Sequence, residues 1–109
     1  KMLVIDSLTT LVMALPELSE ARIMIDFLRR AKPEDTTLIA TANMLMGQKR
    51  IGIGVEEIVA DVVLLLERKI VKNEYRIFIS VLKMRGSPHS RKRHEVVITP
   101  NGIRIVTVA

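Results

Sequence analysis

The stretch Met2-Leu3-Val4-Ile5-Asp6-Ser7 is an apolar, β-branched run that ends abruptly at a carboxylate and a hydroxyl. Four consecutive apolar residues are typical of a strand that is buried on both faces, as in a parallel sheet. Open α/β sheets bind ligands beyond the carboxyl ends of their strands, which makes Asp6 a candidate ligand for magnesium or for water. In the alternative interpretation, Asp6 and Ser7 only cap the turn and helix that follow. This stretch alone leaves both interpretations open.

The next segment predicts an amphipathic helix over roughly residues 18–31, with Ser19 as its N-cap. Its apolar residues recur at the spacing i, i+3, i+4 and i+7, which places them in one stripe along the helix. These residues are Ala21, Met24, Ile25 and Leu28. Lys32-Pro33 ends the helix, because the residue before a proline avoids the helical conformation.

A second β-branched run, Thr36 to Ala42, follows the helix. Strands joined by one helical crossover are parallel and usually neighbours. We therefore expect Thr41 and Asn43 to lie beside Asp6 at the same edge of the sheet. There they either sense a bound ligand or simply end a strand.

The rest of the chain predicts strands with a different pattern. Val59 to Glu67 is the most apolar run and predicts a third buried strand, whereas Tyr75 to Met84 and Glu95 to Val108 alternate as antiparallel strands do. Thr99-Pro100-Asn101-Gly102 is a strong hairpin turn. Met44 to Gly54 predicts a mobile loop, and its Gly-x-Gly is weak evidence for phosphate binding. The fold class is therefore α/β, with parallel strands and a crossover helix followed by antiparallel C-terminal hairpin strands.

Composition limits the classes of protein to consider. A chain of 109 residues is one domain or part of one, and 49% hydrophobic residues with a mean hydropathy of +0.28 predict some apolar surface that meets a partner. No apolar run approaches the length of a membrane span, and the start does not resemble a signal peptide, which predicts a cytoplasmic protein without a membrane partner. The absence of cysteine and the presence of only two histidines predict no structural metal.

The basic charge is concentrated in one block. Residues 1–67 carry seven Lys or Arg against ten Asp or Glu, whereas Arg68 to His94 carries nine against Glu74 alone. Such a block can bind the phosphates of a nucleic acid or a nucleotide. It is equally compatible with a solvated basic surface.

Four segments resemble the KaiC-like branch of the RecA-type P-loop ATPases, in the order in which that family has them. Val4 to Ser7 resembles a Walker B strand, and Gly54 to Asp61 resembles the segment that enters the next strand. Lys83 to His89 is similar to the family's Lys-x-Arg-Gly-Ser-x-His segment, and Asn101 to Ile105 to its closing hairpin. No Gly-x-x-x-x-Gly-Lys-Ser/Thr motif precedes the Walker B strand. The resemblance implies a partial RecA-type P-loop ATPase fold, with residues 1–109 as its C-terminal part.

The resemblance also implies a nucleotide site at the strand ends. Asp6 matches the Walker B carboxylate that orders Mg²⁺ on ATP, usually through water, and Ser7 flanks it. Thr41 and Asn43 match the position after the neighbouring strand at which a polar residue senses the γ-phosphate. Relatives often have Gln or Glu there.

A second set of residues matches groups that, in hexameric relatives, face the nucleotide of the adjacent subunit. This set is Lys83, Arg85 and His89. An arginine finger needs the rigid fork of a guanidinium, which Arg85 has, and Lys83 adds a second positive charge. Period-two alternation would place Lys83 and Arg85 on one face of their strand. Alternatively, the two residues merely flank a tight turn at Gly86.

Two hypotheses about function follow. In the first, the chain is part of an ATPase that forms a homo-hexamer, supplies the Walker B and intersubunit residues, and cannot hydrolyse ATP alone. In the second, it is a basic nucleic-acid-binding or protein-interaction module that uses Arg68 to His94. The first is favoured because the second leaves Asp6 unexplained, and because three aromatic residues give little surface for base stacking.

Overall fold

The computed structural model describes residues 1–44 and 59–107. The chain divides into two compact units, Lys1–Ala60 and Asp61–Ala109, and each unit is described by itself. The predicted loop from Met44 to Gly54 lies outside the described residues except for Met44, and so do Gly54 to Ile58 of the segment that resembles the ATPase family.

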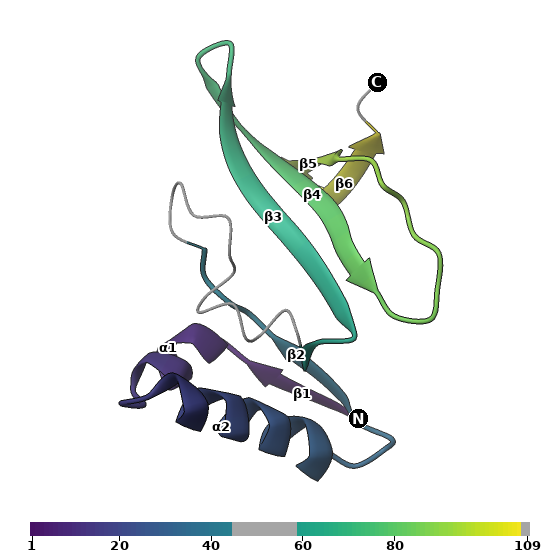
Figure 1. The fold of residues 1–109 in the computed structure, drawn as a ribbon. Helices are drawn as coiled ribbons and strands as arrows, with labels where there is room; N and C mark the ends of the chain where they lie inside the picture. Colours follow the sequence, from purple (N-terminus) through teal and green to yellow (C-terminus); the bar gives the residue numbers. More distant parts are fainter. Residues whose placement is uncertain (45–58, 108–109) are drawn as a thin grey trace. The chain divides into compact units, whose positions relative to one another are not determined.

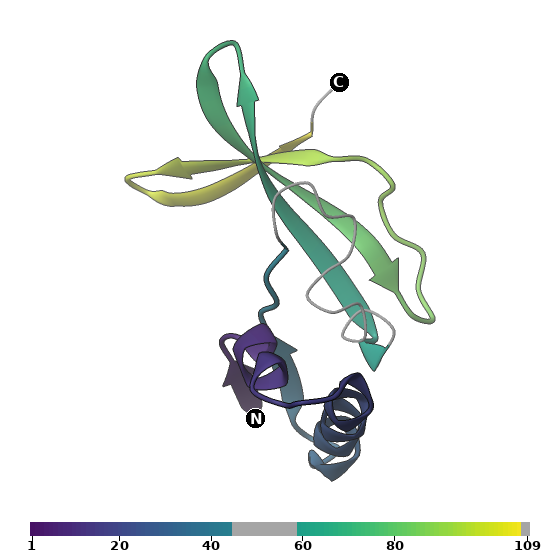
Figure 2. The ribbon, with the colours of Figure 1, turned by 60° about the vertical axis from the view of Figure 1, so that its left-hand side comes forward.

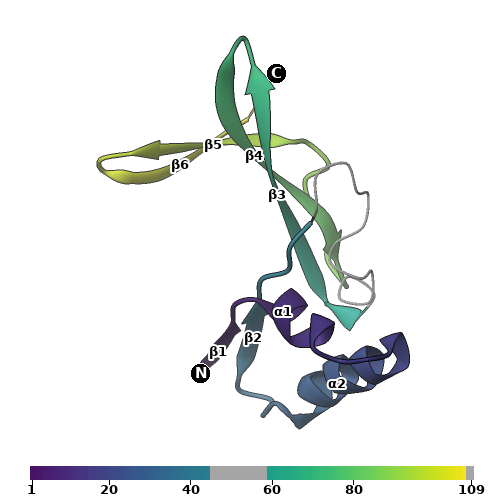
Figure 3. The same ribbon diagram turned by 90° about the vertical axis from the view of Figure 1, so that its left-hand side faces the viewer.

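The first unit is a strand–helix–strand arrangement. Strands β1 (Met2–Ile5) and β2 (Thr37–Ala40) are parallel neighbours, in register from Met2 opposite Thr37 to Ile5 opposite Ala40. Helices α1 (Leu8–Met13) and α2 (Leu18–Ala31) connect them and lie on one face of the strand pair (Figures 1 and 3). The parallel pairing confirms the sequence prediction.

The core of the first unit forms between the two helices and the strands. The stripe predicted on α2 supplies much of it, which confirms the helical period. The buried residues are Leu8, Val12, Ala21 and Ile25, with Ile5, Leu15, Met24, Leu28 and Val59 packed against them.

Two predictions for this unit are wrong. The N-cap of α2 is Glu17, whose extended backbone starts the helix at Leu18, so Ser19 is already helical and its hydroxyl instead donates to the Glu17 carboxylate. Strand β1 is not buried on both faces, because the side chains of Met2 and Val4 are exposed. The helices cover one face of the strand pair, and the described residues of this unit supply no second layer.

The second unit is an antiparallel sheet of four strands in the order β3-β4-β5-β6. Their bounds are β3 Val62–Val71, β4 Glu74–Met84, β5 His94–Thr99 and β6 Gly102–Thr107. Strands β4 and β5 pair only over Ile77–Ile79, and the β5–β6 hairpin runs at a steep angle to the β3–β4 hairpin (Figures 2 and 3). The change from parallel to antiparallel strands confirms the predicted fold class.

Strand β3 corrects the prediction of a buried strand over Val59 to Glu67. It begins later, at Val62, continues to Val71, and pairs antiparallel with β4. Within β3 only Val63 is buried, and β3 is an edge strand with one neighbour in the described sheet. An apolar run therefore identified the strand but not its place in the sheet.

Two tight turns close the hairpins. The predicted turn before Gly102 is confirmed, since β5 ends at Thr99, β6 starts at Gly102, and Gly102 has a φ of +124°. The β3–β4 turn was not predicted. It consists of Lys72 and Asn73, with φ values of 51° and 65°, and two positive φ angles are typical of a type I′ hairpin turn.

The most exposed apolar residues of this unit gather on one face of the sheet. In antiparallel strands, residues directly opposite each other point to the same face of the sheet. The observed register therefore places a set of large apolar side chains on one face. We call this set the apolar sheet face. It comprises Leu64, Leu66, Ile70, Tyr75, Ile98, Ile103 and Ile105, which are all more than half exposed.

Candidate functional site

The carboxyl ends of β1 and β2 are joined by a side-chain contact. Asp6 follows β1, Thr41 follows β2, and the Thr41 hydroxyl donates a hydrogen bond of 2.5 Å to Asp6 Oδ1. Both residues are exposed. The structure therefore brings Thr41 beside Asp6, as the strand order predicts. Their role toward a ligand stays a prediction.

Backbone contacts hold the segment that carries Thr41 and Asn43. The Thr41 amide donates to Ile5 O at 3.0 Å, and Thr41 O accepts from the Leu8 amide at 2.8 Å. The backbone amide of Asn43 donates to the buried hydroxyl of Thr9 at 2.9 Å. Thr41 thus has a fixed backbone on the same edge as Asp6. The structure gives no contact between the Asn43 side chain and Asp6.

Ser7 caps α1, and Asp6 does not. The Ser7 Oγ accepts a hydrogen bond of 3.3 Å from the Thr10 amide, which is the geometry of an N-cap. The peptide bond between Asp6 and Ser7 is cis. The capping interpretation is therefore confirmed for Ser7, while the Asp6 carboxylate contacts the neighbouring strand.

The oxygen groups at this edge suit magnesium only when a phosphate ligand is also present. Magnesium is commonly held by one or two carboxylates together with waters and the phosphates of a substrate. Asp6 is one carboxylate, and no group of three or more acidic, histidine or cysteine side chains occurs among residues 1–44 and 59–107 that would bind a metal ion by itself. Asp6 thus fits a water-linked magnesium site on a nucleotide.

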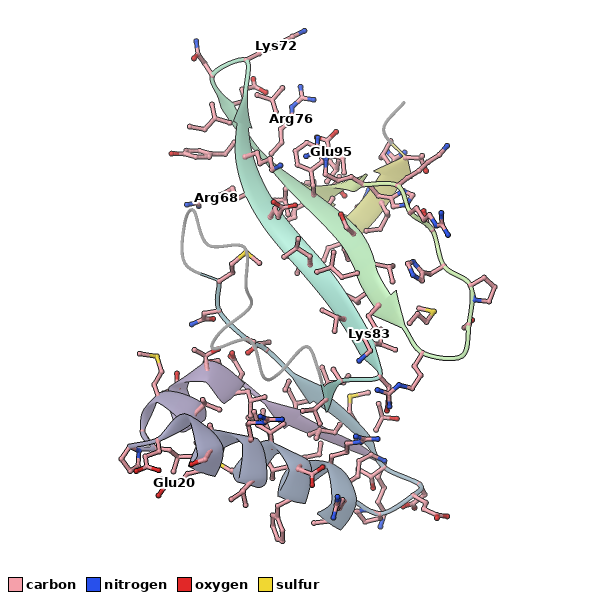
Figure 4. The ribbon with its side chains drawn as sticks, in the orientation of Figure 1. Glu20, Arg68, Lys72, Arg76, Lys83 and Glu95 are labelled. Carbon is pink, nitrogen blue, oxygen red and sulfur yellow. The ribbon has the colours of Figure 1, made fainter. Side chains whose placement is uncertain are left out.

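The second set of predicted residues lies in the other unit. Strand β4 ends at Met84, so Arg85 lies outside the strand, and the period-two argument that placed it on one face with Lys83 does not extend to it. Arg85 instead forms an ion pair with Asp61, with 3.0 Å between Nη1 and Oδ1. His89 Nδ1 lies 3.0 Å from Ser90 O. Figure 4 shows Lys83 near the end of β4, at the far end of the hairpin from Lys72.

Asp61 was missed by the sequence analysis. The sequence places it at the end of the segment that resembles the ATPase family and predicts no partner for it. The sequence could have predicted this pair, because Asp61 precedes β3 and Arg85 follows β4. The two open ends of a hairpin lie side by side. The Lys72-Asn73 turn, which fixes that hairpin's register, had not been recognised.

Most cations of the block from Arg68 to His94 have partners within the chain. The register also places Arg68 and Lys69 on opposite faces of β3, so the charges do not form one basic face. Arg76 and Glu95 form an ion pair with 3.8 Å between Nη1 and Oε2, and Figure 4 labels both residues in the same part of the sheet. The other pairs are Lys69 with Glu67, Arg85 with Asp61, Arg68 over the ring of Tyr75 and Arg93 over the ring of Phe78. These contacts favour a structural role for much of the block.

An α/β unit with a carboxylate at its strand ends has the arrangement in which open α/β sheets bind their ligands. The model of the family described as "ATPase: KaiC" matches residues 1–108, and the chain therefore belongs to the KaiC ATPase family.

Among solved structures, the chain is similar to a KaiC-like protein from the hyperthermophilic archaeon Pyrococcus horikoshii OT3. The two are 31% identical with a TM-score of 0.76, over 96% of this chain and 48% of the archaeal chain. The chain thus spans about half the length of that relative. A comparison with curated proteins gave no match. No helix in the described part of the chain is long and apolar enough to cross a membrane.

Proposed function

We propose that residues 1–109 are the C-terminal part of an ATPase domain, from the Walker B strand onward, and that the complete protein hydrolyses ATP with Mg²⁺ as a homo-hexamer. The observation that carries this proposal is the hydrogen bond from Thr41 to Asp6 across the ends of two parallel strands. Ligands of open α/β sheets bind beyond such strand ends. The family match over nearly the whole chain supports the same assignment.

Asp6 is the proposed Walker B carboxylate. Thr41 orients its Oδ1, and none of the described residues forms a hydrogen bond or ion pair with its Oδ2. Oδ2 can therefore accept a hydrogen bond from a water molecule on magnesium. Magnesium would neutralise charge on the phosphates, and Asp6 would set its position. Ser7 keeps Asp6 at the start of α1, and Thr41 and Asn43 provide polar groups beside the γ-phosphate.

Lys83, Arg85 and His89 are proposed to act on the nucleotide of the adjacent subunit. Phosphoryl transfer depends on positioning and on neutralising negative charge, and fixed cations supply both. The Arg85 side chain is 48% exposed, so an anion can reach its guanidinium. Arg85 and Lys83 would stabilise the transition state, and His89 would contact the bound nucleotide.

The chain alone is proposed not to hydrolyse ATP. Its sequence has no Gly-x-x-x-x-Gly-Lys-Ser/Thr motif, whose backbone amides and lysine hold the phosphates in this class of ATPase. The archaeal relative is about twice as long as the matched part. We assign the phosphate-binding loop and the general base to another part of the complete protein.

The test is the substitution Asp6→Asn in the complete protein. Asparagine keeps the shape and the acceptor for Thr41 but removes the charge. We expect the rate of ATP hydrolysis to fall about 10- to 100-fold, as for other groups that act on a metal through hydrogen bonds to its ligands. Asp26→Asn is the control, because Asp26 is a carboxylate on α2 that is paired with Arg30. Equal hydrolysis by both variants would refute the Walker B assignment.

A further inference from the structure

Asp61 and Arg85 are joined by two contacts at the open end of the β3–β4 hairpin. The Arg85 amide donates to Asp61 O at 2.8 Å, and Arg85 Nη1 lies 3.0 Å from Asp61 Oδ1. The first residue of β3, Val62, pairs with the last residue of β4, Met84. The backbone hydrogen bond joins the residue before β3 to the residue after β4, and the ion pair holds the guanidinium against Asp61.

The backbone on both sides of Arg85 is also defined. The β3–β4 register shifts between Val63 and Leu64, which leaves Leu82 as an extra residue, and such bulges re-aim the side chains that follow. Gly86 has a φ of +75°, and a β-carbon added there would meet nothing within 4 Å. Glycine is thus needed for the turn conformation and not for space. Arg85 lies between a bulge and a turn that set its direction.

The ion pair itself contributes little to folding. The two side chains are 48% and 64% exposed, and pairs at such positions typically contribute about 0–1 kcal/mol. Its larger effect is on the rotamers of a long side chain, which would otherwise be mobile. A guanidinium has five N–H donors, and the bond to Asp61 uses one of them. Arg85 can therefore hold Asp61 and a phosphate at once.

We propose that Asp61 is a positioning residue for Arg85: it holds the guanidinium in the orientation from which Arg85 contacts the phosphates of a nucleotide bound by the neighbouring subunit. This inference rests on the proposed function of Arg85. Asp61 itself does not touch the nucleotide. It reduces the number of conformations that Arg85 must lose when the transition state forms.

The experiment is a double-mutant cycle in the complete protein with Asp61→Ala, Arg85→Ala and the double variant. We expect Asp61→Ala to lower kcat by at most about fivefold, because an exposed ion pair of this kind can supply no more than that through the orientation of Arg85. The affinity for a non-hydrolysable ATP analogue, measured by titration, should change less than about twofold, because the orientation of Arg85 matters most in the transition state. The double variant should be no slower than Arg85→Ala, since Asp61 acts only through Arg85.

Matched variants separate this inference from its premise. Glu95→Ala breaks the ion pair with Arg76 in the same sheet and should leave kcat unchanged. If Asp61→Ala does not fold, as shown by its thermal unfolding, Asp61→Asn replaces it, and a kcat reduced by a smaller factor is expected. An active Arg85→Ala protein would refute the proposed function. A slow Arg85→Ala protein together with a normal or faster Asp61 variant would refute only the positioning role.

Discussion

The hydroxyl of Thr41 donates to the carboxylate of Asp6 and so connects the ends of two parallel strands that are 35 residues apart in sequence. The contact requires the parallel register in which Ile5 lies opposite Ala40, because only then do the next residues of both strands meet. A one-residue slip would direct one of the two side chains to the other face of the sheet. The position of the Asp6 carboxylate is thus a direct consequence of strand pairing.

Thr41→Val should weaken this link without changing the strand. Valine keeps the β-branched shape and loses the hydroxyl, so the free energy of unfolding should fall by about 1 kcal/mol. Urea denaturation of the 109-residue chain measures this change. Thr37→Val, on the same strand and with no side-chain hydrogen bond to the described residues, is the control. An equal effect of both substitutions would mean that the contact with Asp6 contributes nothing to stability.

The turn at Lys72 and Asn73 offers a second test. Both residues have positive φ angles, and Asn-Gly is the preferred pair for a type I′ turn. Replacing Lys72 by Asn together with Asn73 by Gly should stabilise the chain by about 0.5–1 kcal/mol, whereas Lys72→Val should destabilise it. Thermal unfolding measures both. Lys69→Val, in the regular part of β3, should not show the loss expected for Lys72→Val.

The elements of this fold could be predicted where a local pattern decides them. The helical stripe from Ala21 to Leu28 and the turn before Gly102 depend on residues close in sequence, and both are confirmed. The parallel pairing of β1 and β2 followed from the short crossover. Thr41 could be placed beside Asp6 for the same reason.

Other features depend on partners that no local pattern reveals. The apolar runs at Met2 and at Val62 indicate strands, but whether a layer covers a strand depends on other elements, so the predicted burial was wrong for both. The pairing of Arg85 with Asp61 depends on the hairpin register, which is set by an unusual Lys-Asn turn and shifted by a bulge at Leu82. Site residues in the second unit could therefore be named from the sequence, while their contacts could not.

Self-association is expected for the 109-residue chain. Strand β3 is an edge strand in the described sheet, and unpaired edges tend to pair with another chain. The apolar sheet face adds to this tendency, because large exposed apolar patches drive association. Light scattering should therefore give a mass above the 12.3 kDa of one chain.

Two substitutions on opposite faces test the cause of this association. Leu66→Lys places a charge on the apolar sheet face, where Leu66 is 64% exposed, and should shift the chain toward the monomer. Val97→Lys places the same charge on the other face of the sheet and should have a smaller effect. A wild-type chain that stays monomeric at high concentration would contradict the expectation, and equal effects of the two substitutions would exclude the apolar sheet face as its cause.

Mixed rings test whether Arg85 acts across a subunit interface. In the complete protein, Arg85→Ala should lower turnover far more than nucleotide affinity, because the interaction strengthens in the transition state. Asp6→Ala should also be inactive. If Arg85 and Asp6 serve the same nucleotide from different subunits, an interface between the two kinds of subunit can contain one intact site.

At such an interface, the Arg85→Ala subunit keeps Asp6 and the Asp6→Ala subunit supplies Arg85. Mixing the two inactive proteins should therefore restore part of the wild-type hydrolysis rate, and the recovered rate should vary with the mixing ratio. Subunit exchange is verified separately with fluorescently labelled proteins, and a mixture of Asp6→Ala with the double variant Asp6→Ala/Arg85→Ala is the control that should stay inactive. If subunits exchange and no activity returns, Arg85 acts within its own subunit or lies outside the catalytic machinery, and the intersubunit role of the segment from Lys83 to His89 must be abandoned.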